Sequence, residues 1–430
     1  MNCNFKFPTT VKYPSIPCYI DNTTTVYPLT GSSFLTGPEY VLAKRQGCVF
    51  DIKSAFYIEP KTKLNVVKNK YELIKPFYGI IKNIQALRRV HKKGTINNLL
   101  YKEMGNSIYG NVVRGMSNKK SFDSQTGKTF RVTGTPLSNP VLASWTTAFI
   151  RSVIGECLHN IQKLGGQVVS VTTDGFITNI QDLENKILTL PREDTNLLRK
   201  YRALRLELSG SSEGLEIKSE GKGILSWTTR GQLGIEGKMV AATGFQRGGY
   251  EKSELVDLFK NVLKSGDKFF EFTRKSLRSA KDIFNKGGHV TAILKDQMFR
   301  LFYDNRRRII EPIEVANSKN VDRSNMLLDS EPLLNIYQCK TLRFLSKFPI
   351  TVPFNKNNTN RATTVYKTGI EVGVRNFIKA YYGVSEKFGL RGDEFRNTKE
   401  IISFISGDKS TKGIKISRHS ISKLKNRKLF

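Results

Sequence analysis

The sequence predicts an α+β fold, which contains strands and separate helical stretches. Two observations predict the class, and the length predicts the number of structural units. Residues 168–178, VVSVTTDGFIT, contain two short apolar runs joined by an Asp-Gly turn, which indicates a β-hairpin. Residues 133–166 carry apolar side chains at helical spacing. The length of 430 residues predicts two to four structural units rather than one.

The composition predicts an ordered chain with a polyanionic partner. Hydrophobic residues make up 39% of the chain and aromatic residues 10%, which is enough for hydrophobic cores. Lysine and arginine number 70 against 37 acidic residues, so the formal net charge is +33. An excess of this size is typical of proteins that bind nucleic acid. An AT-rich genome, which raises the lysine and asparagine content, is the alternative explanation.

The cysteine, histidine and apolar patterns argue against several other classes. The five cysteines form no Cys-x-x-Cys pair and the four histidines are scattered, so we expect a reducing compartment, no zinc site and no histidine-based metal cluster. The sequence shows no run of about 18 apolar residues, so we expect no membrane span. The first residues, MNCNFKFPTTVKYP, show no signal-peptide pattern.

The first part of the chain is predicted to be rich in strands. Residues 1–37, which are rich in Pro, Thr and Gly, indicate irregular β-structure. Residues 37–47 indicate a helix with Pro38 near its first turn and Gly47 at its end. Residues 48–60, CVFDIKSAFYIEP, alternate in polarity and indicate a strand.

Two helices are predicted to follow as a hairpin. Residues 71–93 have a helical pattern that Gly94 ends, and Thr95 is a suitable cap for a second helix. The basic residues that would line this hairpin are Arg88, Arg89, Lys92, Lys93 and Lys102.

A long helix is predicted over residues 133–166, ending at Gly165 and Gly166. Its apolar positions are Leu142, Trp145, Phe149, Val153, Leu158 and Ile161. A second region of strands is predicted at 214–243. From residue 250 onward helical patterns predominate, over 253–266, 267–288 and 290–310.

Two motifs carry candidate chemistry. In the predicted hairpin, Asp174 is either a solvated turn residue or a carboxylate that binds Mg²⁺ beside a groove. In KEMGNSIYG, residues 102–110, positions 102, 106, 109 and 110 lie on one helical face. A lysine there can pair with triphosphate oxygens, and a tyrosine two turns later can stack under a base or sugar. An ordinary polar helix ending in glycine is the alternative.

These residues resemble motifs B and C of family B DNA polymerases. The KxxxNSxYG pattern of motif B is matched at every fixed position, by Lys102, Asn106, Ser107, Tyr109 and Gly110. The segment TTDG, residues 172–175, resembles the DTDS core of motif C. Asp174 falls on the metal-binding aspartate of that core, and Thr172 replaces its first aspartate.

The resemblance implies both a fold and a reaction. The fold is a right-hand polymerase palm, an antiparallel sheet backed by helices, with helical-hairpin fingers and a mostly helical basic thumb. The reaction adds dNTPs to the primer 3′-hydroxyl of template-primer DNA by two-metal catalysis with Mg²⁺ or Mn²⁺. Asp174 would be the catalytic residue and metal ligand. The nucleotide-binding residues would be Lys102, Asn106, Tyr109, Arg88 and Arg89.

Two further basic stretches are candidates for DNA binding. ILSWTTRGQLGI, residues 224–235, resembles the strand that follows motif C, with Arg230 in its lysine place and Gln232 in its tyrosine place. Arg230 would contact primer-strand phosphates, or would be an ordinary surface arginine. The three arginines after residue 305 would contact duplex phosphates from the thumb, unless Asp304 pairs with one of them; they are Arg306, Arg307 and Arg308.

Asp51 has two interpretations. DIKSAFY, residues 51–57, fits the motif A pattern DxxSLYP. The span from Asp51 to Lys102 is short, however, because two helices of about 10–14 residues and their loops nearly fill it. Residues 35–60 also resemble an insertion in protein-primed polymerases of phages and linear plasmids, which would place Asp51 on an insertion strand. Motif A would then lie upstream of Met1.

The second interpretation predicts a chain that binds DNA but polymerises poorly alone. It would be a fragment, a degenerate and catalytically silent copy, or one part of a split enzyme. The residues before 50 are too few for a proofreading exonuclease domain. The protein-primed branch implies a terminal protein whose hydroxyl side chain primes synthesis. The composition and the reduced cysteines suit a mitochondrial linear plasmid or a virus-encoded protein that is not secreted.

We predict five segments along the chain. They are a β-rich insertion over 1–70, fingers with motif B over 71–110, a palm with motif C over 111–245, a thumb-like helical region over 246–400 and a basic tail over 401–430. The tail is predicted to be a flexible polyanion anchor or a short helix that enters a groove.

Overall fold

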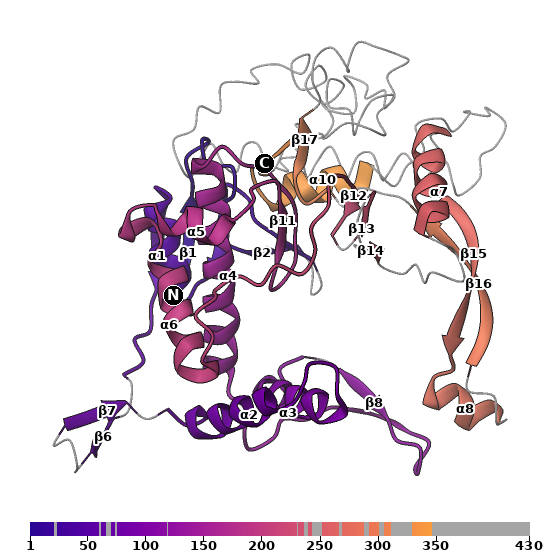
Figure 1. The fold of residues 1–430 in the computed structure, drawn as a ribbon, viewed down its shortest axis with the longest axis horizontal. Helices are drawn as coiled ribbons and strands as arrows, with labels where there is room; N and C mark the ends of the chain where they lie inside the picture. The colour runs from indigo at the N-terminus through magenta and orange to yellow at the C-terminus, as the bar shows by residue number, and fades with distance from the viewer. Residues whose placement is uncertain are drawn as a thin grey trace, which may run out of the picture. The chain divides into compact units, whose positions relative to one another are not determined.

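Helices and small antiparallel sheets make up the protein (Figure 1), which confirms the α+β class. The computed structural model describes residues 1–20, 24–59, 62–65, 70–73, 75–117, 119–229, 231–235, 240–242, 252–265, 269–287, 292–300, 305–310 and 329–345. These residues form two compact units. Unit 1 joins Met1–Ala55 to the described residues from 305 onward. Unit 2 contains the described residues of Phe56–Phe302.

Unit 1 is built on a three-stranded antiparallel sheet in the order β4–β1–β5. Its elements are β1 (Asn2–Lys6), β2 (Cys18–Tyr19), β3 (Thr25–Val26), β4 (Thr30–Phe34), α1 (Gly37–Arg45), β5 (Val49–Ser54), β17 (Arg308–Ile310), β18 (Asp329–Glu331) and α10 (Ile336–Leu345). The strands and the helix predicted over residues 1–47 are therefore present, whereas the strand predicted over 48–60 is shorter, because β5 ends at Ser54. Thr36 caps α1, because its backbone N–H and its hydroxyl both donate to the Glu39 carboxylate, at 3.0 and 3.1 Å.

Residues from the first 50 positions and from the segment 329–345 share the core of unit 1. Phe5 and Phe7 pack edge to face at its centre, with ring centroids 5.8 Å apart. Leu333 and Cys339 are fully buried in the same cluster. The backbone N–H of Leu29 donates to the carbonyl of Leu333 at 2.8 Å, so the segment 329–345 is bound to the N-terminal part of the chain.

Unit 2 contains the candidate motifs. Its first elements are β6 (Thr62–Asn65), β7 (Lys70–Leu73), α2 (Tyr78–Val90), α3 (Ile96–Val112), β8 (Lys120–Phe122), β9 (Thr129–Arg131), α4 (Pro140–Lys163), β10 (Val168–Val171) and β11 (Phe176–Thr178). They are followed by α5 (Leu183–Leu188), the 3₁₀ helix η1 (Arg192–Asp194), α6 (Asn196–Ser209), β12 (Ile224–Thr228), β13 (Gly231–Gly234), β14 (Val240–Ala242), α7 (Lys252–Ser265), β15 (Phe269–Leu277), α8 (Ala280–Lys286) and β16 (Ala292–Arg300).

Helix α4 is the centre of the packed part of unit 2, where it contacts α5 and α6 (Figure 1). A buried carboxylate joins two of these helices. The Glu156 side chain is 1% exposed and accepts hydrogen bonds from the backbone N–H groups of Leu197 and Leu198, at 3.1 and 2.8 Å. These N–H groups belong to the first turn of α6, so an acid on α4 caps a helix that lies far along the chain.

Some predicted boundaries are wrong. The helix predicted from residue 71 begins at Tyr78, because Lys70–Leu73 pairs as strand β7 with β6. The long helix begins at Pro140 rather than 133, since Asn139 caps it by accepting from the N–H of Leu142 at 3.0 Å. Trp145, predicted to face the core, is 48% exposed. The strand region predicted from residue 214 begins at Ile224.

The helices predicted over 267–288 and 290–310 are mostly wrong. Lys252–Ser265 is a helix as predicted, but Phe269–Leu277 and Ala292–Arg300 form an antiparallel ribbon with α8 at one end (Figure 1). Both stretches have helix-compatible spacing but are rich in phenylalanine, isoleucine and leucine, and the nine-residue pairing satisfies the backbone of each strand. The tail predicted over 401–430 lies outside the described residues.

Helix α4 also bears on the expectation of no membrane span. Of the helices in the described chain, Pro140–Lys163 is long and apolar enough, by length and composition alone, to cross a membrane. Core helices meet the same criterion. Residues 152–157 are all buried in the fold, and the helix packs against α5 and α6, so a role as a core helix explains its hydropathy.

Candidate functional site

Two side chains, those of Thr95 and Asn98, form hydrogen bonds at the turn of the α2–α3 hairpin. Gly94 adopts a φ of +93°, which lets the chain reverse between the helices. Thr95 caps α3, with its Oγ1 accepting from the N–H of Asn98 at 3.4 Å. The buried Asn98 amide donates to the carbonyls of Arg88 and His91, at 3.0 and 3.1 Å. These carbonyls lie at the end of α2, where no intrahelical donor remains for them.

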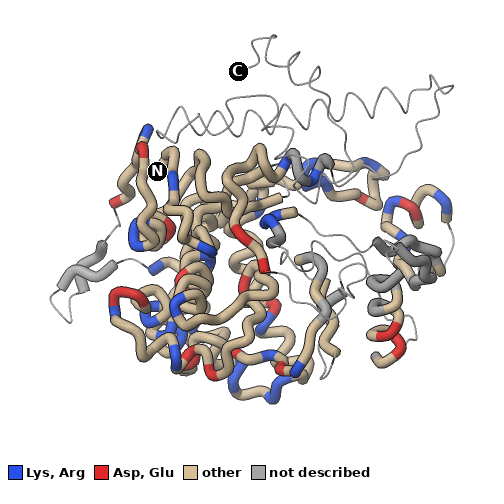
Figure 2. The backbone as a smooth tube through the Cα atoms, turned by 90° about the horizontal axis from the view of Figure 1, so that it is seen from above, with Lys and Arg blue, Asp and Glu red and all other residues tan. Residues whose placement is uncertain are grey.

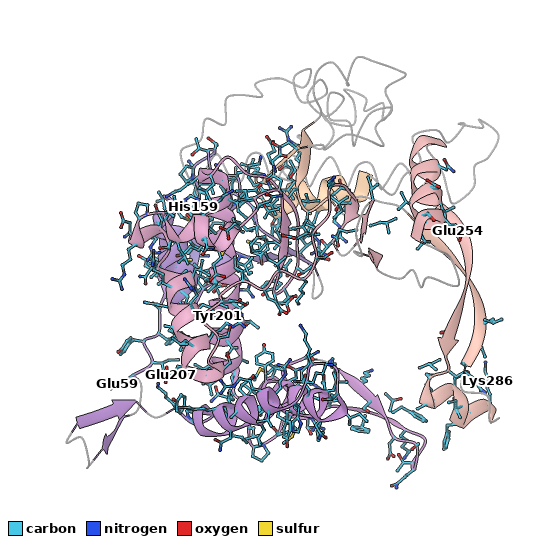
Figure 3. All side chains as sticks on the ribbon, viewed as in Figure 1. Glu59, His159, Tyr201, Glu207, Glu254 and Lys286 are labelled. Carbon is cyan, nitrogen blue, oxygen red and sulfur yellow. The ribbon has the colours of Figure 1, made fainter. Side chains whose placement is uncertain are left out.

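Ion pairs join this hairpin to the α6 region. Lys75 pairs with Glu207 on α6 at 3.3 Å, and Lys93 pairs with Glu216 at 3.2 Å. Glu207 is labelled on α6 in Figure 3. The hydrogen bond from Lys75 lowers the pKa of Glu207, and the one from Lys93 lowers the pKa of Glu216. Both acids therefore stay ionised, and the predicted basic residue Lys93 is engaged with a partner.

The motif on α3 presents one exposed face, as its spacing predicted. The four positions are all exposed; they are Lys102, Asn106, Tyr109 and Gly110. Tyr109 is 37% exposed. Within the described chain, the side chains of Lys102 and Asn106 form no hydrogen bond or ion pair. The face is therefore available to a ligand that offers acceptors and a flat apolar group.

The two arginines of α2 differ in surroundings. Arg88 is half-buried and Arg89 is exposed, both in the last turn of α2. A Cβ added to Gly210 would lie 2.3 Å from a terminal nitrogen of Arg89, so this guanidinium lies at the C-terminal end of α6. A helix C-terminus attracts a cation. Within the described residues, no hydrogen bond joins Arg88 or Arg89 to the Lys102 side chain.

The hairpin that carries Asp174 is confirmed. Strands β10 and β11 pair antiparallel, with Val171 opposite Phe176. Both the N–H and the Oγ1 of Thr172 donate to the carbonyl of Gly175, at 2.7 and 3.1 Å, and close the loop. Asp174 is exposed in this loop, and its carboxylate forms no hydrogen bond or ion pair with the described chain. Both carboxylate oxygens are open to an added ligand.

A contact that sequence reasoning missed holds this hairpin to a second sheet. The buried Gln232 on β13 donates from Nε2 to the Ser170 Oγ on β10, at 2.6 Å. Gln232 is the residue that the resemblance placed at the tyrosine position. The neighbouring Arg230, predicted to contact DNA, lies outside the described residues. The sequence offers no signal for this pairing, because it joins two strands through their side chains.

The end of α3 is joined to the start of α4 by a capped turn. Ser138 donates from its hydroxyl to the carbonyl of Arg114 at 2.8 Å, and the N–H of Asn139 donates to the carbonyl of Val112 at 2.9 Å. Asn139 then caps α4. The motif helix, α4 and the Asp174 hairpin therefore follow one another along the chain. The run SNP at 138–140 was the available signal, since Ser and Asn before Pro are typical of a helix start.

The remaining predicted residues lie in unit 1. Asp51 is exposed on β5 and accepts a hydrogen bond from the Asn4 amide at 2.7 Å. Arg307 donates to the hydroxyl and carbonyl of Ser330, at 2.8 and 2.9 Å, and Arg308 pairs with Glu331. Arg306 is half-buried beside them. Asp304 lies outside the described residues. Contact of these arginines with DNA stays a prediction, as does the assignment of Asp51.

The donor set at Asp174 limits what it could hold. No group of three or more His, Cys, Asp or Glu side chains that could bind a metal occurs in the described ranges. Mg²⁺ is commonly bound through one or two carboxylates, with water and substrate phosphates completing its six oxygen ligands. The open carboxylate of Asp174 fits such a site when a nucleotide supplies further oxygens.

Comparison with known proteins finds similarity to a DNA polymerase. The chain is 28% identical over 352 residues to the primer-independent DNA polymerase PolB of Escherichia coli. The alignment covers 79% of this chain and 38% of that polymerase, so the chain spans less than half of the relative's length. Neither a protein-family model nor a solved structure matches the chain.

Proposed function

We propose that this chain is the polymerase portion of a DNA-directed DNA polymerase of family B, which adds dNTPs to a primer 3′-hydroxyl. The observation that carries the proposal is that unit 2 contains two exposed features, each without a partner in the described chain. One is the Lys102, Asn106 and Tyr109 face of α3, and the other is the open carboxylate of Asp174. The similarity to the Escherichia coli polymerase supports the same reaction.

The residues of α2 and α3 would bind the incoming nucleotide. The Lys102 ammonium would neutralise triphosphate oxygens, together with Arg88 or Arg89. Tyr109 would lie against the nascent base pair, since a half-exposed aromatic ring offers a flat apolar surface. Holding the nucleotide in line with the primer 3′-hydroxyl is itself a large part of the catalysis of phosphoryl transfer.

Asp174 would hold a divalent metal ion, Mg²⁺ or Mn²⁺. Such an ion supplies positive charge beside the phosphate oxygens when it is bound. The contribution of the protein is a carboxylate fixed in position by the β10–β11 pairing and by the Thr172 hydrogen bonds to Gly175. A second carboxylate would complete the site.

The charge of the surface supports a nucleic-acid partner. Basic and acidic residues are interspersed along the described chain (Figure 2), yet basic residues are in large excess overall. On the β8–β9 hairpin, Lys120 lies directly opposite Arg131, and both are exposed. Like charges in this position destabilise a strand pair unless an anion lies against them. The phosphate backbone of a nucleic acid is a polyanion that could contact both side chains.

Primer extension by the Asp174→Asn variant tests the proposal. The asparagine keeps the size of the side chain but weakens metal binding, so we expect Mg²⁺-dependent incorporation of dNTPs to fall by about 100-fold or more. The melting temperature should not change, because the carboxylate has no partner in the fold. The control, Glu193→Gln, alters another exposed carboxylate of unit 2 and should retain full activity.

The outcomes separate the alternatives. Undiminished synthesis by Asp174→Asn would show that the proposed site is wrong. If the unaltered chain binds DNA with steep salt dependence but incorporates nothing, it is a catalytically silent copy or one part of a split enzyme. If the unaltered chain synthesises DNA and Asp51→Asn abolishes this, Asp51 is the motif A carboxylate rather than a residue of an insertion strand.

Two modes of initiation follow from different observations. The resemblance of residues 35–60 to the protein-primed branch supports priming by the hydroxyl group of a terminal protein. The name of the Escherichia coli relative, a primer-independent polymerase, favours initiation without a primer as the second candidate. A template without primer distinguishes them. Labelled nucleotide attached to a protein supports the first mode, and free labelled product supports the second.

A further inference from the structure

A pocket in unit 2 is lined by three arginines. Its volume is about 520 Å³, and it lies between η1, α6 and the loop after α6. Its lining residues are Arg192, Arg199, Arg202, Ala203, Leu206 and Ser212. Four of them repeat at positions i, i+3, i+4 and i+7 along α6, so they share one helical face. None of them belongs to the site proposed for nucleotide transfer.

Two of the arginines are fixed by contacts that leave part of each guanidinium unused. Arg199 donates from Nε to the Thr195 hydroxyl at 2.8 Å and from one terminal nitrogen to the Leu188 carbonyl at 2.7 Å. Arg202 donates from Nε to the Ser212 carbonyl at 2.7 Å. Terminal nitrogens of both guanidinium groups remain available for a ligand. Because the side chains are already ordered, a ligand does not have to order them.

The positive charge of the pocket is only partly compensated. Arg202 lies 2.9 Å from the Glu184 carboxylate, which also accepts from the backbone N–H groups of Gly214 and Leu215. The acceptors for Arg199 are both neutral. Arg192 is exposed, and its side chain forms no hydrogen bond or ion pair with the described chain. Three cations therefore face one acid.

The nearest other acids do not cancel this excess. Asp194, two residues after Arg192, pairs with Lys163 at 2.6 Å. Glu193 is exposed beside Arg192, and we describe no ion pair between the two. A guanidinium group presents two parallel N–H donors to an oxyanion, and phosphate oxygens match this geometry.

We propose that the pocket lined by Arg192, Arg199 and Arg202 is a second phosphate-binding site, which holds the backbone of a single-stranded nucleic acid. Ala203 and Leu206 are exposed on its wall and provide an apolar surface for a sugar or base next to the bound phosphate. Binding here does not require nucleotide transfer, so the site would bind its ligand even if the chain were catalytically silent.

Binding by the full chain of a fluorescein-labelled oligothymidylate tests the site without metal ions. We expect Arg192→Glu to weaken binding about fivefold and to lower the slope of log affinity against log salt by about 0.7, the value for one lost phosphate contact on a single strand. Arg192→Lys, which keeps the charge, should keep the slope. The matched control is Lys200→Glu, an equal charge change at an exposed position of α6 that does not line the pocket.

Chemical modification of arginine provides a second measurement, which uses the unaltered protein and so does not require a variant to fold. Phenylglyoxal should modify Arg192 in the unaltered protein, and the oligonucleotide should slow this modification several-fold. A parallel titration with inorganic tripolyphosphate identifies the source of the phosphate. If Arg192→Glu weakens tripolyphosphate binding but not oligonucleotide binding, the site takes free nucleotide phosphates. If Arg192→Glu and Lys200→Glu behave alike with both ligands and Arg192 is not protected, the proposal is wrong.

Discussion

At the scale of single residues, Asn98 decides the geometry of the candidate nucleotide site. Its side-chain amide donates to two carbonyls at the end of α2. Its backbone N–H donates to the hydroxyl of Thr95, which caps α3. Asn98 therefore provides hydrogen-bond donors for the last carbonyls of α2, although it is itself a residue of the first turn of α3. The directions in which Arg88 and Lys102 project depend on this turn.

Replacing Asn98 tests this role. Asn98→Ala leaves the carbonyls of Arg88 and His91 without their donor, so the free energy of unfolding should fall by about 1–3 kcal/mol. Urea-induced unfolding measures the change. Asn97→Ala alters the neighbouring exposed residue of the same helix and should cost less than about 0.5 kcal/mol. Equal losses in the two variants would show that the Asn98 contacts contribute nothing to stability.

Residue type and residue surroundings carry different information in this chain. The pattern of charged and aromatic residues identified Asp174, Lys102 and Tyr109 as candidates, and all three lie on exposed surfaces as a ligand site needs. The same kind of argument identified Arg307, whose guanidinium is bound to Ser330 and lies 5.1 Å from the Tyr13 ring. An arginine in a basic run can hold the fold together as readily as it can bind a phosphate.

At the scale of elements, the junction between α3 and α4 orders the candidate site. Gly115 follows α3 with a φ of +81°, and a Cβ there would lie 2.4 Å from the backbone nitrogen of Gly134. The chain before α4 therefore passes directly against the end of α3. Only glycine permits both this conformation and this approach.

Gly115→Ala should therefore destabilise unit 2. The added methyl group would clash with backbone atoms of Gly134, and the left-handed conformation is strained for alanine. We therefore expect the free energy of unfolding to fall by about 1–3 kcal/mol. Thermal unfolding measures it. The control is Gly79→Ala in α2, where a Cβ meets nothing within 4 Å. That substitution should be neutral or stabilising by up to about 1 kcal/mol. A stable Gly115→Ala protein would contradict the close approach.

The β15–β16 ribbon shows where patterns along one element mislead. Its two strands were predicted as helices because charged and apolar residues recur at three- and four-residue intervals. The pairing of the two strands determines the secondary structure instead. It extends over nine residue pairs, which include Phe270 with Phe299 and Phe272 with Gln297. A partner strand some twenty residues away satisfies the backbone, and spacing within one strand cannot reveal it.

At the scale of the whole molecule, all five cysteines are free and buried. Burial raises the pKa of Cys18 and of Cys48 to about 12, and it also raises the pKa of Cys3 and Cys157. A thiol must ionise and be accessible in order to react. The fold therefore protects every cysteine of the chain from oxidation and from metal exchange.

Thiol titration tests this protection. At mildly alkaline pH, the native protein should react with Ellman's reagent at fewer than one thiol per chain, and all five should react in concentrated guanidinium chloride. Because the thiol pKa values of Cys18 and Cys48 are higher in the folded state, their contribution to stability is complete below about pH 9 and is lost as the pH rises toward 12. A Ser117→Cys variant, exposed on the surface, should add one reactive thiol. Rapid reaction of a native cysteine would contradict the burial.

The sequence by itself determined the features that depend on neighbours along the chain. The face of α3 follows from helical periodicity, and the Asp174 hairpin follows from its turn residues. The extent of α1 follows from Pro38 and Gly47, and the C-terminal end of α4 follows from Gly165. Backbone sterics and local hydrogen bonds act over a few residues, so their signals are present in short stretches.

Only the tertiary structure decided the contacts that join distant stretches. The pairing of β15 with β16, the bond from Gln232 to Ser170 and the capping of α6 by Glu156 each join groups that no local pattern relates. Unit 1 likewise combines Phe5 and Phe7 with Leu333 and Cys339, from distant parts of the sequence, in one core. Burial of apolar side chains and backbone hydrogen bonding stabilise these contacts. Both depend on which groups are close in space and not on their separation along the chain.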